Sequence, residues 1–181
     1  MGCFSLVDQG AFWLSERPDE PGSIGWNAAC PRVTTWITLE LADDTALTVF
    51  DTHFDHRNVL ARHRSAEFLR SKVAVALDSG PVIVTADLNC SESTSPYEVL
   101  VGSGSDDGEA VLRDPLAAAD HRGPRRTYHE FAGIPLERRD YVLVDPSVAV
   151  TSSRTIDERG RERFSSDHFA VVADVSLPNR S

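Results

Sequence analysis

Residues 81–89 read PVIVTADLN, a short apolar run followed at once by an aspartate and, two residues later, an asparagine. A continuous apolar run of this length, bounded by turn-forming residues, is typical of a strand that is buried on both faces of a sheet. We therefore expect residues 81–86 to form a central strand. Asp87 and Asn89 then lie at its end, where a rigid element can deliver side chains into a site.

Two segments that precede this strand show the alternation of a strand with one buried face. They are residues 34–41 (TTWITLEL) and residues 46–53 (ALTVFDTH). Small polar and apolar residues alternate in both, which predicts two further strands. Asp43 and Asp44 lie between them and predict a hairpin turn.

The segment between the second of these strands and the central strand predicts a long helix. Asn58 is a good N-cap, and the pattern continues to about Leu77. Apolar or small residues recur there at intervals that fit one helix face, at Val59, Ala66, Leu69, Val73 and Leu77. One face of this helix should therefore be buried.

The rest of the chain predicts more strands than helices. We expect strands at residues 141–144, 148–156 and 169–175, one or two helical turns at residues 95–101, and loops at residues 19–25, 102–108 and 122–126. Strands thus dominate, with one long helix inserted. The pattern favours an α+β architecture of layered sheets, in a single domain over residues 1–181.

Composition narrows the class of protein. The chain has 181 residues, 41% of them hydrophobic, which is enough for a real core. The formal net charge of −10 argues against loose, non-specific binding to nucleic acid. The three cysteines suggest neither a disulfide framework nor a cysteine zinc site. Without a basic leader or a long apolar run, we expect a soluble, cytoplasmic protein that has no contact with membranes.

Four short segments place ionisable residues at strand ends. They are residues 51–56 (DTHFDH), 86–89 (ADLN), 139–141 (RDY) and 165–168 (SSDH). A single aspartate at a strand end is more often a turn or capping residue than a catalyst. The four segments in this order, however, resemble the endonuclease/exonuclease/phosphatase family. Three more segments resemble it in the expected order, at residues 12–23 (FWLSERPDEPGS), 25–32 (GWNAACPR) and 127–131 (TYHEF), so the resemblance covers residues 10–175.

This resemblance implies a deoxyribonuclease-I-like four-layer fold, in which a β-sandwich is flanked by helices. It implies a divalent-metal-dependent phosphoesterase that hydrolyses phosphodiester bonds, as a nuclease or a related phosphodiesterase. Members of the family cleave DNA, RNA, phosphoinositides and sphingomyelin, so the substrate is a phosphodiester that can be, but need not be, a nucleic acid.

The resemblance also assigns roles to the residues of the central motifs. Asp87 matches the aspartate that orients and deprotonates the attacking water, and Asn89 matches the amide that holds a phosphate oxygen or the metal ion. Two residues apart in an extended chain, both would point to the same side. His168 matches the histidine that contacts the phosphate, and Asp140 matches the carboxylate that accepts its other ring N–H.

Other matches complete the expected site. Asp167 corresponds to a carboxylate near the metal, and oxygen ligands suit Mg²⁺ or Mn²⁺. His53 corresponds to a histidine on the opposite wall, which can act as a general acid or contact the phosphate. Arg32 can support the phosphate or pair with a structural acid. His56 can line the substrate groove, but a structural role for it and for Asp55 fits equally well.

The sequence also departs from the family pattern. Members open with a strand that bears an asparagine, followed by a helix and a strand that ends in a metal-binding glutamate; neither motif precedes Phe12. Glu16 and Glu20 lie in a loop and do not replace that glutamate. A wrongly assigned start codon, a truncated gene, or a split protein would each explain this. A complementing chain or a homo-oligomer could then cover the missing strands.

Two rival hypotheses remain open at this point. The segment His53–Phe54–Asp55–His56 overlaps in part with the HxHxDH signature of the metallo-β-lactamase fold, but Asp51 stands where that signature has its first histidine. Alternatively, the chain is a catalytically inactive remnant or a binding module that keeps the groove but not the metal.

Overall fold

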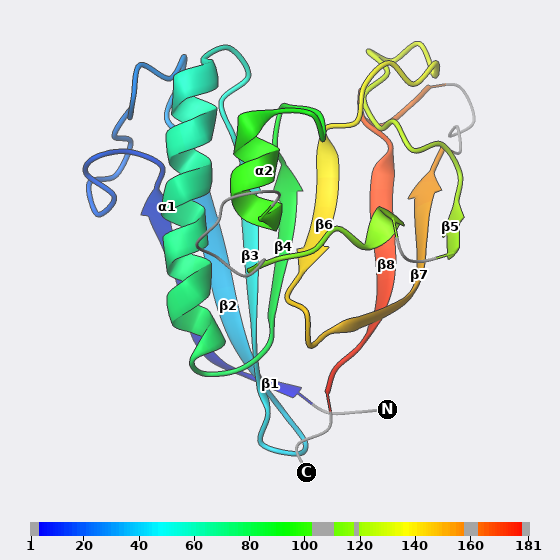
Figure 1. The fold of residues 1–181 in the computed structure, drawn as a ribbon. Coiled ribbons are helices and arrows are strands. Elements are labelled where there is room, and N and C mark those ends of the chain that lie inside the picture. Colours follow the sequence, from blue (N-terminus) through cyan, green and yellow to red (C-terminus); the bar gives the residue numbers. More distant parts are fainter. Residues whose placement is uncertain (1–3, 103–110, 118–119, 158–162, 179–181) are drawn as a thin grey trace.

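The chain folds into two sheets with helices on one side (Figure 1). The computed structural model describes residues 4–102, 111–117, 120–157 and 163–178. The predicted loop at residues 102–108, with Asp106 and Asp107, lies outside these ranges except for Gly102. In sheet order, the five-stranded sheet holds β1 (Phe4–Trp13), β2 (Val33–Leu41), β3 (Ala46–His53), β4 (Val82–Asp87) and β6 (Asp140–Val144). The three-stranded sheet holds β5 (Asp120–Arg122), β7 (Ala149–Ile156) and β8 (Ala170–Ser176).

β4 is the central strand that its apolar run predicts. It pairs in parallel with β3 and antiparallel with β6. The parallel pairing requires a long crossover, and α1 (Val59–Leu77) supplies it. Val82 and Val84 are fully buried. The two predicted strands that precede the helix are confirmed as β2 and β3, joined by the expected turn, in which Asp44 adopts a φ of 61°.

The long helix begins where the sequence predicts it. The side chain of Asn58 accepts hydrogen bonds from Leu60 N at 2.9 Å and Ala61 N at 3.2 Å. The predicted positions Ala66, Leu69 and Val73 are buried against the five-stranded sheet, together with the short helix α2 (Ser95–Val101). The expected burial of Val59 is wrong: its side chain is 61% exposed, because the buried stripe begins at Ala61.

The second sheet covers only part of the other face of the five-stranded sheet. Leu47, Ile83, Val144 and Val148 are buried between the two sheets. The predicted α+β sandwich is therefore confirmed. A short 3-10 helix, Pro115–Ala117, lies beside β6 and β7.

β1, which the sequence analysis does not anticipate, forms an outer strand beside β2. Its register places Leu6 opposite Leu39 and Gln9 opposite Ile37. Leu6 is 53% exposed, and Phe4 and Ile37 are also exposed on this sheet. Within the described ranges, no helix is long and apolar enough to cross a membrane.

Candidate active site

Strand register brings three of the predicted site residues together. His53 ends β3, Asp87 ends β4 and Asp140 begins β6. His53 pairs directly with Asp87, and Asp87 pairs directly with Asp140. Directly paired residues project their side chains from the same face of a sheet. The three side chains therefore form a row across the neighbouring ends of β3, β4 and β6.

Asp87 lies between two histidines. Its Oδ2 is 3.2 Å from Nε2 of His53 and 4.0 Å from Nε2 of His168. Burial raises the pKa of Asp87, although His53 counteracts this effect. Burial also lowers the pKa of His53, although Asp87 counteracts it. The pKa values of the two side chains are thus shifted toward each other.

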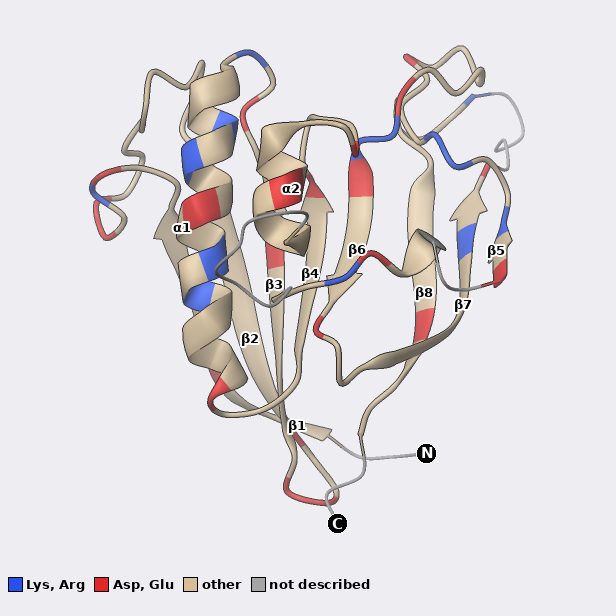
Figure 2. Cartoon of the chain, viewed as in Figure 1, with Lys and Arg blue, Asp and Glu red and all other residues tan. Residues whose placement is uncertain are grey.

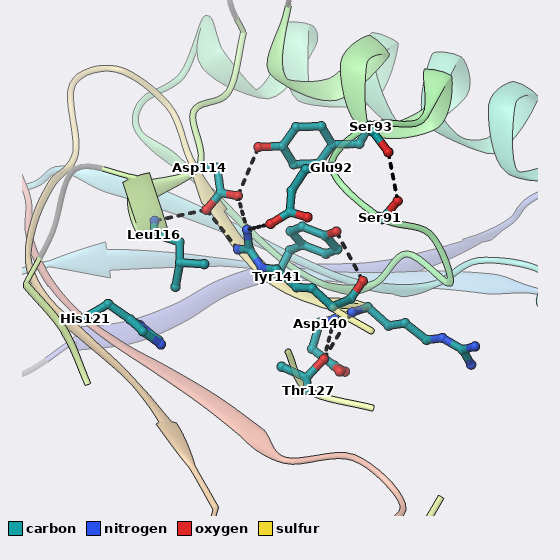
Figure 3. Close-up of polar contacts among 12 residues, drawn as sticks. Ser91, Glu92, Ser93, Asp114, Leu116, His121, Thr127, Asp140 and Tyr141 are labelled. Carbon is teal, nitrogen blue, oxygen red and sulfur yellow. Dashed lines mark hydrogen bonds and ion pairs between the residues drawn. The ribbon is translucent and has the colours of Figure 1, made fainter. Parts of the chain in front are cut away.

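His168 is oriented by Asp140. The distance between Nδ1 of His168 and Oδ2 of Asp140 is 2.7 Å. This pairing leaves Nε2 of His168 on the side of Asp87. Thr127 holds the backbone on which Asp140 lies, since its Oγ1 accepts hydrogen bonds from the N–H groups of Arg139 and Asp140 at 3.0 and 3.2 Å (Figure 3).

Asn89 reaches the site through a turn. The expected extended chain through Asn89 is wrong, because β4 ends at Asp87 and Asn89 has a φ of 48°. Its N–H donates to Oδ1 of Asp87 at 2.8 Å, which stabilises the turn. Asparagine tolerates this left-handed conformation better than most residues do. Its Nδ2 donates to the carbonyl of Phe54 at 3.0 Å and lies 2.9 Å from Nε2 of His53.

A single pocket of about 450 Å³ contains every predicted site residue. The pocket is lined by Arg32, His53, His56, Asp87, Asn89, Asp140, Asp167 and His168, together with Tyr128, Arg139 and Ser166. Tyr128 and Arg139 are the residues that sequence reasoning missed as pocket residues. Both lie inside segments that carry the resemblance, TYHEF and RDY, so a signal was present but assigned them no role.

Arg32 and His56 contact each other on one wall of this pocket. Nη2 of Arg32 is 3.0 Å from Nδ1 of His56. The arginine thus donates to an imidazole, and its positive charge remains beside the pocket. Arg125 and Arg126 do not line the pocket.

Asp55 has a structural role instead. It is 1% exposed and accepts N–H groups of Ala29, Arg57 and Asn58 at 2.8, 2.9 and 2.7 Å. Burial by itself would raise the pKa of Asp55, but these three donors outweigh it and hold that pKa below its usual value. Asp55 therefore fixes the loop that starts α1.

The donor set fits a divalent cation. Asp87, Asp140 and His168 each offer a ligand atom within 4.8 Å of the others. Carboxylate oxygens are the ligands that Mg²⁺ and Mn²⁺ prefer. Asp167 and Asn89, the predicted metal ligands, line the same pocket, but Asp167 is outside this group of three. Cys30, Asp55 and His56 form a second group with similar spacing.

Comparison with known proteins identifies a family. The sequence signature of the Endonuclease/Exonuclease/phosphatase family matches residues 7–168. No curated protein matches the chain. A family protein from Bacteroides vulgatus shares 32% identity over 96% of this chain and 66% of its own, with a TM-score of 0.86.

Two further solved structures show the breadth of these relatives. A mannosyl-6-phosphatase from Bacteroides thetaiotaomicron shares 30% identity over 96% of this chain and 67% of its own, with a TM-score of 0.84. TDP2 from D. rerio, in complex with a single-strand DNA product, shares 13% identity over 96% of this chain and 69% of its own, with a TM-score of 0.69. At this identity the likeness shows the fold alone. The chain thus spans about two thirds of the length of these relatives, and as little as 60% of another solved structure. The alternative of a metallo-β-lactamase fold is wrong, since these relatives have a different fold.

Proposed function

This chain belongs to the endonuclease/exonuclease/phosphatase family, and we propose that it hydrolyses phosphodiester bonds with a divalent metal ion, Mg²⁺ or Mn²⁺. One observation carries the proposal: strand register aligns His53, Asp87 and Asp140 in one row, with His168 beside them in the same pocket. Hydrolysis of a phosphoester requires an activated water, donors for the phosphate oxygens and help for the leaving oxygen.

Asp87 is the proposed base for the attacking water. Its carboxylate is the member of the row that both histidines approach, at 3.2 and 4.0 Å. Because burial raises its pKa, the ionised form is a better proton acceptor than an ordinary aspartate.

His168 is the proposed donor to the phosphate. Asp140 occupies Nδ1, so the ring presents Nε2 to the pocket. Asn89 and Arg32 add further donors from other parts of the wall. His53 is the proposed acid that returns a proton to the leaving oxygen, since a lowered pKa makes the protonated ring a stronger acid.

Asp87 and Asp140 would hold the cation, and the predicted ligands Asp167 and Asn89 line the same pocket. When bound, a divalent ion stabilises the negative charge that develops on the phosphate and lowers the pKa of a bound water. We expect the protein to need Mg²⁺ or Mn²⁺ for this reason.

A substrate panel tests the proposal. It contains bis(p-nitrophenyl) phosphate, single- and double-stranded DNA, RNA and a phosphoinositide, each measured with Mg²⁺, with EDTA, and with EDTA followed by excess Mg²⁺. We expect hydrolysis of at least one diester that EDTA abolishes and Mg²⁺ restores. Hydrolysis that persists in EDTA, or none in any condition, would contradict the proposal, and the second result would favour the inactive binding module.

A second candidate, hydrolysis of small phosphomonoesters, has its own support. The relative from Bacteroides thetaiotaomicron that shares 30% identity is a mannosyl-6-phosphatase. The net charge of −10 opposes long nucleic acids, and Figure 2 shows Asp and Glu positions, in red, on strands, helices and loops alike. Mannose 6-phosphate, added to the panel, separates the candidates. Release of phosphate from it, without cleavage of any diester, would favour the monoesterase.

A cytoplasmic location remains a prediction. Fractionation of cells that express a tagged chain would test it.

A further inference from the structure

Arg139 presents a charged, fixed and partly unused guanidinium to the pocket. It lines the pocket, and its side chain is 23% exposed. Its Nε and Nη2 donate to Oε2 of Glu137 at 3.0 and 2.9 Å. A guanidinium carries five N–H donors. Among the described residues no partner is found for Nη1, so donors remain for a ligand.

Tyr128 fixes the plane of this guanidinium. The central carbon of the Arg139 guanidinium lies 3.7 Å from the centroid of the Tyr128 ring. The same ring lies 5.1 Å from the ring of His168, centroid to centroid. Arg139 is therefore one aromatic ring away from the histidine that is proposed to contact the phosphate.

The backbone of both residues is held as well. Tyr128 N donates to Glu137 O at 2.9 Å, and Tyr128 forms isolated bridges with Glu137 and His168. Arg139 N donates to Thr127 Oγ1, and Arg139 O accepts from Leu88 N at 2.8 Å. A preorganised cation of this kind loses little entropy when it binds an anion.

We propose that Arg139 and Tyr128 form a subsite for a second anionic group of the substrate, next to the centre that holds the reacting phosphate. This inference rests on the proposed function and narrows its substrate class to small phosphate esters that carry a further carboxylate or phosphate. The planar fork of arginine matches both groups, since each offers two oxygens. The subsite lies beside His168, so about one aromatic ring should separate the second anionic group from the reacting phosphorus.

Calorimetry with three probes tests the subsite in the presence of Mg²⁺. Phenyl phosphate carries only the reacting group, whereas 4-carboxyphenyl phosphate adds a carboxylate and 1,4-phenylene bisphosphate adds a phosphate. We expect the wild type to bind the last two roughly tenfold more tightly than the first, the scale of one charge-assisted hydrogen-bonded pair. Whichever of these two probes binds more tightly identifies the anion that the subsite prefers.

The variants Arg139→Gln and Arg139→Lys locate the effect. Arg139→Gln should remove the preference and leave the affinity for phenyl phosphate nearly unchanged, and Arg139→Lys should keep part of it. Arg126→Gln is the matched control, because Arg126 is an exposed arginine two residues before Tyr128 that does not line the pocket. Thermal unfolding of each variant shows whether it is folded.

The outcomes separate the subsite from the proposed function. Equal affinity of the wild type for all three probes, or a preference that survives in Arg139→Gln, would overturn the subsite even if the protein hydrolyses diesters. Failure of the wild type to bind any of the probes would overturn the subsite, whereas the substrate panel decides separately whether the protein hydrolyses diesters. As a kinetic readout, p-nitrophenyl 4-carboxyphenyl phosphate should have a lower KM than bis(p-nitrophenyl) phosphate, and Arg139→Gln should raise that KM without lowering kcat.

Discussion

The contact of 2.7 Å between His168 Nδ1 and Asp140 Oδ2 decides which ring nitrogen faces the pocket. A carboxylate at this position fixes the tautomer and the orientation of the ring. It also places a negative charge in the group of three that can hold a cation. In the proposed mechanism Asp140 therefore has two roles, one toward the histidine and one toward the cation.

Replacing Asp140 by asparagine tests this double role. Asp140→Asn keeps the shape but removes the charge, so we expect kcat to fall by about 10- to 100-fold and the requirement for Mg²⁺ to rise. Steady-state kinetics at several Mg²⁺ concentrations measures both. Asp120→Asn, an exposed change of the same kind on β5, is the control. A wild-type kcat in Asp140→Asn would show that the role is wrongly assigned.

Asp55 predicts a pH dependence of stability. Its pKa is depressed in the folded protein. The stabilisation that it provides is therefore present above its unfolded pKa, which is about 4, and is lost as the pH falls through the folded pKa. Asp55→Asn should lower the free energy of unfolding by about 2 kcal/mol at pH 7, and by less at about pH 3.

Urea denaturation at the two pH values measures this difference. Asp19→Asn, an exposed aspartate in a loop, is the control. An equal loss of stability at both pH values would mean that the charge of Asp55 is not what matters.

At the scale of elements, a buried cluster ties the loop after β4 to the start of β6 (Figure 3). Arg138, which is 7% exposed, donates to both carboxylate oxygens of Asp114, at 2.6 and 3.0 Å, and to Glu92 at 2.9 Å. Its guanidinium lies 4.2 Å from the centroid of the Tyr141 ring. The hydroxyl of Tyr141 donates to Cys90 O at 2.9 Å. This cluster fixes the segments on which Asn89 and Asp140 lie.

Arg138→Met tests the cluster. Removing Arg138 leaves the buried carboxylate of Asp114 without its cation, so we expect a loss of about 3–5 kcal/mol in the free energy of unfolding. Arg122→Met, an exposed arginine on β5, is the control. Guanidinium denaturation measures both variants. A loss of less than about 1 kcal/mol, the scale of an exposed ion pair, would show that the cluster contributes little.

Helices and strands whose apolar residues recur at regular intervals could be predicted from the sequence. Strands whose position depends on their neighbours in the sheet could not. Helix α1 and strands β2, β3 and β4 were predictable because burial imposes a pattern on their residues. β1 was missed because an outer strand with exposed apolar residues lacks a clean alternation. β5 was missed because it has three residues, too few for any period.

The candidate site also has features that the sequence predicts and features that it does not. Motif resemblance named Asp87 and His168, and the structure places both in one pocket. Nothing in the local sequence shows that Tyr128 lies beneath Arg139 or that His53 pairs with Asp87. Those contacts depend on strand register and on segments that meet only in the folded chain.

At the scale of the whole molecule, the uncovered end of the five-stranded sheet is an apolar surface. Phe4, Leu6 and Ile37 are 65%, 53% and 37% exposed on neighbouring strands. Exposed apolar residues on an outer strand favour association with other chains. The expectation of a homo-oligomer or a complementing chain remains a prediction.

Ile37→Lys tests for self-association. If this surface mediates it, the wild type should form larger species with increasing concentration and Ile37→Lys should not, because a charge cannot be buried there without a partner. Sedimentation velocity over a wide concentration range measures this. Thr35→Lys, an exposed change on the same strand, is the control. A wild type that stays monomeric at all concentrations would contradict the expectation.

The account depends on Asp87 and His168 acting together on one phosphate, although 81 positions of chain separate them (residue 168 minus residue 87). A double-mutant cycle of Asp87→Ala and His168→Ala, with kcat/KM for a diester as the readout, tests this most directly. We expect each single variant to lose at least about a hundredfold, and the double variant to lose little more than the worse single variant, because residues that act as a unit are not additive. Wild-type activity in both single variants, or strictly multiplicative losses in the double variant, would contradict it.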